Sequence, residues 1–249
     1  MIETLEPKGV SVTDSEWPAW FFVEEQHGPL PFFLHALTIV TGLVDAVSYL
    51  RLGHVFVANM TGNVVFLGFA VTDHLNFSIP ASLTALAAFL VGSLAGGRLG
   101  TMFGRHRGRL LAIVTSAQVG LVGIALFVSL LGAALSDGTV QYGLIVLLGG
   151  TMGLQNATAR RLGVPDMTTT VLTLTLTGLA ADSIGAGGTN PRPVRRMTAV
   201  VLMFIGAAAG AWLLSISTVA VVLSVTLAVL ALVCAGTLRT RHSSASWTR

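Results

Sequence analysis

The chain has 249 residues, of which 53% are hydrophobic and only 10% are charged. Because soluble proteins carry about 25% charged residues, this composition excludes a soluble enzyme, a nucleic-acid-binding protein and a disordered chain. The 28 glycines and the aromatic content of 7% favour packed transmembrane helices over an outer-membrane barrel. The sequence therefore predicts an all-α integral membrane protein, with membrane lipid as a partner and no nucleic acid.

The two ends of the chain differ from its middle. Residues 1–30 are rich in acidic and aromatic side chains, and they lack the basic start and apolar core of a secretory signal. We predict that they form a cytoplasmic or interfacial arm, with a disordered tail as the alternative. Residues 238–249 are predicted to form a cytoplasmic tail.

Residues 31–237 are predicted to form a single membrane domain, because they contain eight apolar runs close to the length of about 17–25 residues that spans a bilayer. The runs cover residues 31–50, 55–72, 79–101, 110–135, 140–159, 164–181, 197–214 and 217–237. The second and sixth runs carry polar residues near their starts, at 59–63 and 166–170. Such clusters are tolerated in a membrane only where protein or a water-filled cavity satisfies the backbone. The sequence thus predicts two broken or re-entrant segments.

Short matches in the same order indicate two homologous halves, residues 31–136 and 139–237. The matches are Gly42-Leu43-Val44-Asp45-Ala46 with Gly153-Leu154-Gln155-Asn156-Ala157, Leu52-Gly53 with Leu162-Gly163, residues 57–64 with residues 164–171, and Gly92 and Gly96 with Gly206 and Gly210. Each match is weak alone, but four in one order make a chance alignment improbable.

The positions of the basic residues distinguish two topologies. If all eight segments cross the membrane, the 14 lysines and arginines divide seven to seven between the two sides. If the second and sixth segments enter and leave by the same face, the division is 13 to 1, with only Arg51 on the poorer side. The positive-inside rule favours the second arrangement. We therefore predict six transmembrane helices plus two broken segments, with both termini cytoplasmic and the second half inverted, as a 3+3 inverted repeat.

The stretch Gly42-Leu43-Val44-Asp45-Ala46-Val47-Ser48-Tyr49, followed by Asn59-Met60-Thr61-Gly62-Asn63, resembles the YoaK-like family of bacterial inner-membrane proteins of unknown function. The resemblance covers nearly all of residues 31–237. It implies a protein of the bacterial cytoplasmic membrane with about six spans. It implies no substrate, although some members are loosely labelled as small-molecule transporters.

Asp45 is the most conspicuous polar residue of the predicted first span. Thr38, Thr41, Asp45 and Ser48 follow one another at spacings of three and four, which places them on the same helical face. Because an intramembrane carboxylate is costly and usually faces a cavity or a partner, a coupling site for protons or cations is the functional hypothesis. The alternative is a protonated or hydrogen-bonded Asp45 that only locks the two halves together. Its counterpart Asn156 cannot titrate, so any coupling is asymmetric.

The broken segments supply the other candidate residues. Asn59 and Asp166 are predicted to cap short helices that begin near Thr61 and Thr168. The exposed N–H groups and positive dipole ends of such helices can hold an anionic or carbonyl group near the membrane midplane. Capping without ligand binding is the alternative. The complete predicted set of solute-binding or coupling residues is Asp45, Ser48, Asn59, Thr61, Asn63, Asn156, Asp166, Thr168 and Thr170.

Two further patterns concern packing and membrane contact. Glycines recur every fourth position at Gly92, Gly96, Gly100 and Gly104, which predicts close helix contact, with a sliding surface or a homo-oligomer face as the alternative. Arg192, Arg195 and Arg196 are predicted to anchor a cytoplasmic loop to anionic lipid headgroups.

The sequence carries none of the motifs of the common hydrolases, metalloproteases or phosphate-binding loops, so we expect no enzyme, cofactor or metal. The predicted function is transport of an unknown small solute at a midplane site between the broken helices, with proton or cation coupling. A channel-like pore and a non-transporting membrane enzyme or scaffold are the alternatives.

Overall fold

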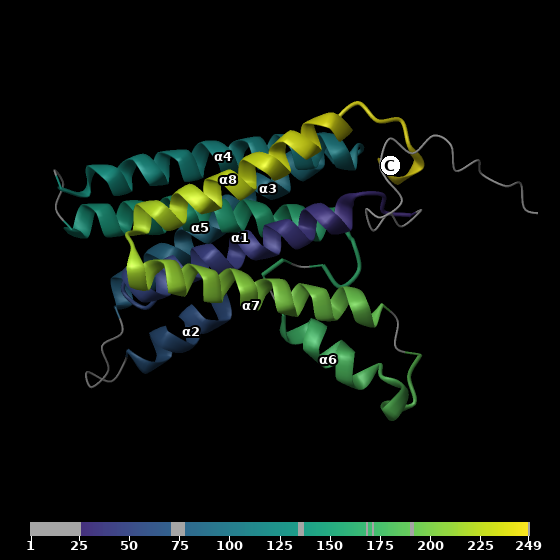
Figure 1. Ribbon diagram of the computed structural model, residues 1–249, viewed down its shortest axis with the longest axis horizontal. Helices are drawn as coiled ribbons and strands as arrows, with labels where there is room; N and C mark the ends of the chain where they lie inside the picture. Colours follow the sequence, from purple (N-terminus) through teal and green to yellow (C-terminus); the bar gives the residue numbers. More distant parts are fainter. Residues whose placement is uncertain are drawn as a thin grey trace, which may run out of the picture.

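The computed structural model describes residues 26–70, 78–133, 137–167, 169–170, 172–189 and 192–248. These residues form eight α-helices (Figure 1). The helices are α1 (Leu30–Arg51), α2 (Met60–Phe69), α3 (Ile79–Phe103), α4 (Arg107–Leu130), α5 (Asp137–Leu162), α6 (Thr173–Ala181), α7 (Pro193–Ile216) and α8 (Val219–Thr240). The prediction of an all-helical protein is therefore confirmed for the described residues.

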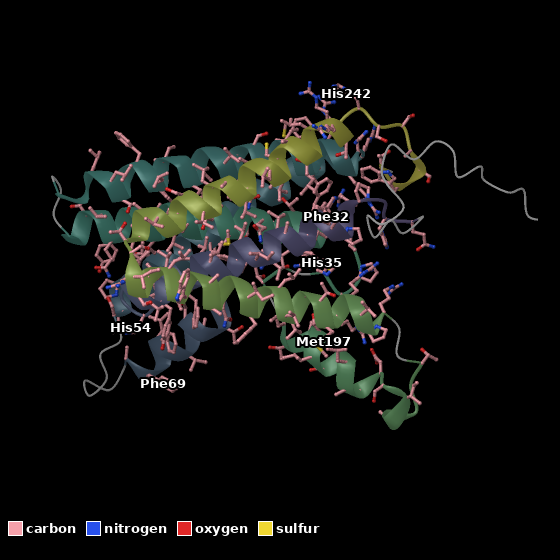
Figure 2. All side chains as sticks on the ribbon, in the orientation of Figure 1. Phe32, His35, His54, Phe69, Met197 and His242 are labelled. Carbon is pink, nitrogen blue, oxygen red and sulfur yellow. The ribbon has the colours of Figure 1, made fainter. Side chains whose placement is uncertain are left out.

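The long helices α1, α3, α4, α5, α7 and α8 lie side by side along the long axis of the molecule (Figure 1). Helices α1, α4 and α7 run in one direction, and α3, α5 and α8 run in the other. His242 lies at the end of the bundle that holds the C-terminus, which we call the basic end, and His54 lies at the opposite end (Figure 2). Among the described residues, every arginine except Arg51 lies at or near the basic end.

The short helices α2 and α6 begin near the middle of the bundle's length (Figure 1). Helix α2 runs outward to the end at which α1 finishes, and α6 runs outward to the end at which α5 finishes. The chain therefore enters the middle of the bundle and leaves it again at the same end, once through α2 and once through α6.

Five helices of the described residues are long and apolar enough to cross a membrane, namely α1, α3, α4, α7 and α8. Helix α5 has 26 residues but is more polar, because it carries Gln155, Asn156, Arg160 and Arg161. It packs against α3, α4 and α1, and much of its middle is buried. A helix that faces protein on several sides needs less apolar surface than one that faces lipid.

The most extensive helix contacts join the two sequence halves, since α3 packs on α5 and α1 packs on α7. Helix α4 packs on α8, α4 also contacts α5, and α1 also contacts α8. Helix α2 contacts α3, and α6 contacts α7. These contacts form equivalent pairs when α1–α4 are matched in order with α5–α8. For example, the α3–α5 contact corresponds to the α1–α7 contact, and the α2–α3 contact corresponds to the α6–α7 contact.

Glycines allow the backbones of these helices to approach closely. A Cβ atom added at Gly92 would collide with the backbone carbonyl of Gly150 across the α3–α5 contact. In the α1–α7 contact, a Cβ atom at Gly206 would collide with the carbonyl of Ile39. The predicted close helix contact is thus confirmed at Gly92. At Gly100 the neighbour is instead the Arg161 side chain.

Glycines also end two of the long helices. Gly53 follows α1 with a φ of +91°, and Gly163 follows α5 with a φ of +63°. Left-handed backbone is readily adopted by glycine, because it has no Cβ atom. Both long helices therefore stop at the positions that the aligned Leu-Gly pairs occupy, and the chain turns back toward the middle of the bundle.

Candidate functional site

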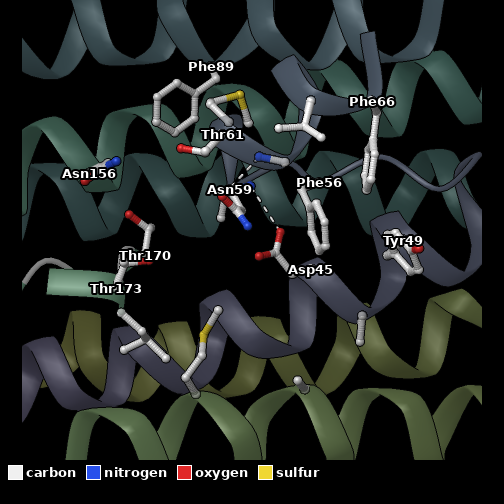
Figure 3. A pocket seen from close by; sticks show the side chains of 18 of the residues that line it. Asp45, Tyr49, Phe56, Asn59, Thr61, Phe66, Phe89, Asn156, Thr170 and Thr173 are labelled. Carbon is white, nitrogen blue, oxygen red and sulfur yellow. Dashed lines mark hydrogen bonds between the residues drawn. The ribbon is translucent and has the colours of Figure 1, made fainter. Parts of the chain in front are cut away.

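A half-open cavity of about 790 Å³ lies beside α1 and α7, where α2 and α6 begin. Figure 3 shows Asn156, Thr170 and Thr173 on one side of this central cavity and Asp45 and Asn59 on the other. Five of the residues predicted from the sequence line it, namely Asp45, Asn59, Thr61, Asn156 and Thr170. The structure therefore brings together polar residues from two distant parts of the chain.

Asp45 is buried in α1 and faces the segment that precedes α2. Its Oδ1 atom accepts hydrogen bonds from the backbone N–H groups of Val57, at 3.3 Å, and Ala58, at 3.1 Å. Both donors belong to the same sequence half as Asp45, so these bonds hold the broken segment rather than joining the two halves. The hydroxyl groups of Thr38, Thr41 and Ser48 donate to carbonyl groups of α1 itself.

The start of α2 agrees with the sequence prediction. Helix α2 begins at Met60, and the Asn59 side chain accepts a hydrogen bond from the N–H of Gly62 at 3.4 Å. Asn63 is fully buried, and its side chain exchanges two hydrogen bonds with the backbone of Phe56. These bonds fold the connecting segment back onto α2. Asn63 therefore does not line the cavity, and its observed role is to shape the break.

The start of α6 differs from the prediction. Helix α6 begins at Thr173 rather than near Thr168, its N-cap is Leu172, and no side chain caps it among the described residues. The predicted capping role of Asp166 is therefore wrong. Pro165 precedes Asp166, and both Asp166 and Thr169 have positive φ angles. Backbone of this kind is not helical, so α6 begins only after it.

Asp166 instead belongs to a cluster of ion pairs beside α6. Its Oδ1 atom lies 2.9 Å from Nε of Arg196, and Nη1 of Arg196 lies 2.8 Å from Oδ2 of Asp182. Arg192 is the second cation near Asp166, at 3.8 Å. The guanidinium of Arg196 packs against Gly178 of α6. The predicted headgroup contact is therefore wrong for Arg196, because its side chain is buried and paired within the protein.

A buried amide network connects the two halves and was not predicted. The Nε2 atom of Gln118 donates to Oε1 of Gln155 at 2.9 Å. The Nε2 atom of Gln155 contacts the hydroxyl groups of Thr41, at 2.9 Å, and Thr169, at 3.2 Å. This network fixes the segment before α6 against α1. Glutamines in an apolar run were the available signal in the sequence, but their partners are remote along the chain.

An aromatic wall on the Asp45 side of the cavity was also missed. The rings of Tyr49 and Phe56 stack with centroids 5.0 Å apart, and Phe56 stacks on Phe66 at 5.9 Å. All three residues line the cavity. The cavity thus combines an apolar aromatic face with a carboxylate and several hydroxyl and amide groups.

The remaining predicted site residues lie elsewhere. Ser48, Asn63 and Asp166 do not line the central cavity, and Thr168 lies outside the described residues.

The arrangement offers two kinds of ligand contact. The Asp45 carboxylate can attract a proton or a cationic group. The starts of α2 and α6 both face the cavity, and backbone N–H groups at helix starts suit an anionic or carbonyl group. Asn156 is polar and has no side-chain hydrogen bond with the described residues, so its amide is free for a solute or water.

The comparisons with known proteins identify a family and a relative. A family model described as "Protein of unknown function (DUF1275)" matches residues 33–236. The UPF0700 transmembrane protein YoaK of Bacillus subtilis (strain 168) is 36% identical over 152 residues, which cover 61% of the chain and 66% of that relative's length. No solved structure matches the chain. The predicted resemblance to YoaK-like proteins is confirmed, and the chain is a multi-pass bacterial membrane protein.

Proposed function

The chain belongs to the DUF1275 family of proteins of unknown function, and we propose that it moves a small solute across the membrane through its central cavity. The observation that carries this proposal is the position of the cavity at the starts of two broken helices. Asp45 and Asn59 line it from the first half of the chain, and Asn156 and Thr170 line it from the second. Many secondary transporters bind their solutes near the midplane, between discontinuous helices from two repeats.

A path for solute requires a membrane topology, and we propose six crossings. Helix α5 is the sixth crossing in this proposal, because it is as long as its neighbours and continues their alternation in direction (Figure 1). Each half then contributes three crossings and one short helix that returns to its own side. An odd number of crossings per half makes the second half inverted.

The packing contacts support a twofold relation between the halves. The alignment pairs Gly42 with Gly153, and both glycines meet the backbone of the opposing helix, at Met203 and Phe89 respectively. It also pairs Gly96 with Gly210. A Cβ atom at Gly96 would lie 2.9 Å from the Ala157 side chain, and one at Gly210 would lie 2.7 Å from the Ala46 side chain. Ala46 and Ala157 are themselves aligned in the predicted repeat, so the two contacts are equivalent.

The distribution of arginines supports an orientation. Because the positive-inside rule places basic residues in the cytoplasm, we propose that the basic end is cytoplasmic. Helix α1 begins at this end and the C-terminus lies there (Figure 1), so both termini are cytoplasmic. At the opposite end, the guanidinium of Arg51 donates a hydrogen bond to the carbonyl of Leu214 at 2.8 Å. Arg51 therefore caps the C-terminal turn of α7.

In this proposal Asp45 is the coupling residue. One carboxylate oxygen holds the segment before α2, so a change in the protonation or cation contact of Asp45 acts directly on the backbone at Val57 and Ala58. A solute that contacts the start of α2 would sense this change. Such a link between ion and solute is what coupled transport requires.

Flux into proteoliposomes tests the proposal. Vesicles with and without protein are given a panel of amino acids, carboxylates and polyols, with and without an imposed proton or sodium gradient. We expect a protein-dependent flux for at least one solute class and accumulation driven by one gradient. Asp45→Asn should abolish the gradient-driven accumulation. Asp182→Asn is the matched control, since Asp182 follows α6 and does not line the cavity.

Three results would contradict parts of this proposal. Unchanged gradient-driven uptake by Asp45→Asn would exclude Asp45 as the coupling residue. The absence of any protein-dependent flux would favour a non-transporting enzyme or scaffold. Flux that never accumulates a solute would indicate a channel-like pore, the second candidate, which is favoured by the structural use of Asp45 in backbone hydrogen bonds.

A further inference from the structure

A second, half-open cavity of about 650 Å³ lies along one face of the α3–α5 pair. It extends from the middle of the bundle toward the basic end, because its lining includes Arg160 and Arg161 in the last turn of α5. Two residues, Phe89 and Asn156, line both this cavity and the central one. The two spaces therefore meet at this pair of side chains.

The second cavity is equivalent to one part of the central cavity. When the repeat alignment is continued along the helices without gaps, all seven residues that line the second cavity correspond to residues that line the central one. The pairs are Phe89 with Met203, Ser93 with Ala207, Gly97 with Ala211, Asn156 with Asp45, Ala157 with Ala46, Arg160 with Tyr49 and Arg161 with Leu50. Two equivalent spaces that meet in the middle are the form expected of a path through an inverted repeat.

The two equivalent spaces differ in charge. Asp45 and Tyr49 line the central cavity, where Asn156 and Arg160 are their counterparts in the second cavity. Arg160 and Arg161 are both exposed. Neither forms an ion pair within the described part of the chain, in contrast to Arg196.

The Arg161 side chain lies along two glycines of α3. Its aliphatic carbons lie against Gly100, where an added Cβ atom would be 3.1 Å from Cγ of Arg161. Its Nε atom would lie 2.9 Å from a Cβ atom at Gly104. Arg160 and Arg161 both border the second cavity, and guanidinium groups suit the oxygens of a carboxylate or phosphate.

We propose that the second cavity is the cytoplasmic half of the solute path and that Arg160 and Arg161 bind an oxyanion of the carboxylate or phosphate class there. This inference rests on the proposed transport function and adds a substrate class to it. An anionic solute would pass between the two cavities beside Phe89 and Asn156. The phosphate of a lipid headgroup has the same chemistry, so the experiment must distinguish it from a soluble anion.

Charge-selective thiol labelling tests the proposal without requiring transport. In a Cys234→Ala background, Gly97→Cys places a thiol in the second cavity, where an added Cβ atom meets nothing within 4 Å. Gly138→Cys is the matched control, since Gly138 is an exposed glycine at the start of α5 with equally open surroundings that lines neither cavity. The proteins are placed in phosphatidylcholine nanodiscs, so that both faces are open to reagent. An anionic and a cationic methanethiosulfonate of similar size are then compared.

We expect Gly97→Cys to react with the anionic reagent at least about fivefold faster than with the cationic one, because a cleft lined by like charges concentrates the opposite charge. The preference should disappear in the Arg160→Gln/Arg161→Gln variant. Millimolar inorganic phosphate should slow the anionic reagent more than sodium chloride of equal ionic strength. Gly138→Cys should react with both reagents and show neither the preference nor the protection.

Three results would overturn the proposal. They are the absence of labelling at Gly97→Cys, equal rates for the two reagents, and protection by phosphatidylglycerol nanodiscs but not by inorganic phosphate, which would identify a lipid site. Because no step requires flux, these results are distinct from a failure of transport. A missing flux together with charge-selective labelling would count against the transport function and leave anion binding at Arg160 and Arg161 supported.

Discussion

At the scale of single residues, Asp45 connects α1 with the broken segment that precedes α2. Val57 and Ala58 are buried, and their N–H groups both point to one oxygen of this carboxylate. A buried backbone donor without an acceptor is costly, at about 1–3 kcal/mol each. Asp45 therefore has a structural role in addition to the proposed coupling role, and the two roles are separable by substitution.

We predict that Asp45→Ala lowers the free energy of unfolding by about 2–5 kcal/mol, because it removes the acceptor of both backbone donors. Asp45→Asn retains a carbonyl oxygen at the same position and should lose only about 1 kcal/mol. Thermal unfolding in detergent measures the difference. Equal stability losses in the two variants would show that the hydrogen bonds at Val57 and Ala58 do not hold the segment.

Sequence reasoning identified Asp45, Asn59 and Asn156 because polar residues are conspicuous in apolar runs. It did not find the contact between Gln118 and Gln155, since nothing in a single sequence tells which buried amides meet across helices. The same limit explains the wrong role for Asp166. A residue before a short helix suits a cap, and its ion pair with Arg196 depends on how α7 packs.

At the scale of elements, glycine sets how closely the long helices approach. Gly92 and Gly206 occupy equivalent positions in α3 and α7, and each faces a backbone carbonyl of its partner helix. Gly97 lies on α3 as well, but an added Cβ atom there meets nothing. The glycines of α3 therefore fall into two classes, and Gly97 lies outside the stripe of glycines at every fourth position.

We predict that Gly92→Ala and Gly206→Ala each lower the free energy of unfolding by about 1–3 kcal/mol, because the backbones must move apart to accept a methyl group. Gly97→Ala should be neutral or stabilising by up to about 1 kcal/mol, because alanine favours the helix. Unfolding of the three variants in the same detergent is the test. A tolerated Gly206→Ala would contradict the equivalence of the two helix contacts, and a destabilising Gly97→Ala would contradict the open surroundings of Gly97.

The broken segments show where sequence prediction of elements succeeds and where it fails. Helix α2 was predicted correctly because Asn59 is a local cap that acts within its own turn. Helix α6 starts later than predicted because its approach is fixed from a distance, by Gln155 at Thr169 and by Arg196 at Asp166. Local signals are readable in a sequence, and tertiary constraints of this kind are not.

At the scale of the whole molecule, two features of the chain determine the arrangement. The short sequence matches indicate two halves, and the helix contacts form the same pattern when each helix is exchanged for the helix four places away in the chain. The arginines gather at one end, which in the proposed topology faces the cytoplasm. The two ends of the proposed path then carry different charges. Asp45 lines the central cavity, and Arg160 and Arg161 line the second cavity.

The central claim, that the second half is inverted relative to the first, is tested most directly by thiol accessibility in intact cells. In the Cys234→Ala background, Gly138→Cys reports on the segment before α5 and Ile184→Cys reports on the segment after α6, where Ile184 is 79% exposed. An impermeant maleimide should label Gly138→Cys, and cysteines in residues 73–78, from outside. It should label Ile184→Cys only after permeabilisation. Labelling of Gly138→Cys and Ile184→Cys from the same side would restore eight crossings and contradict the inverted repeat.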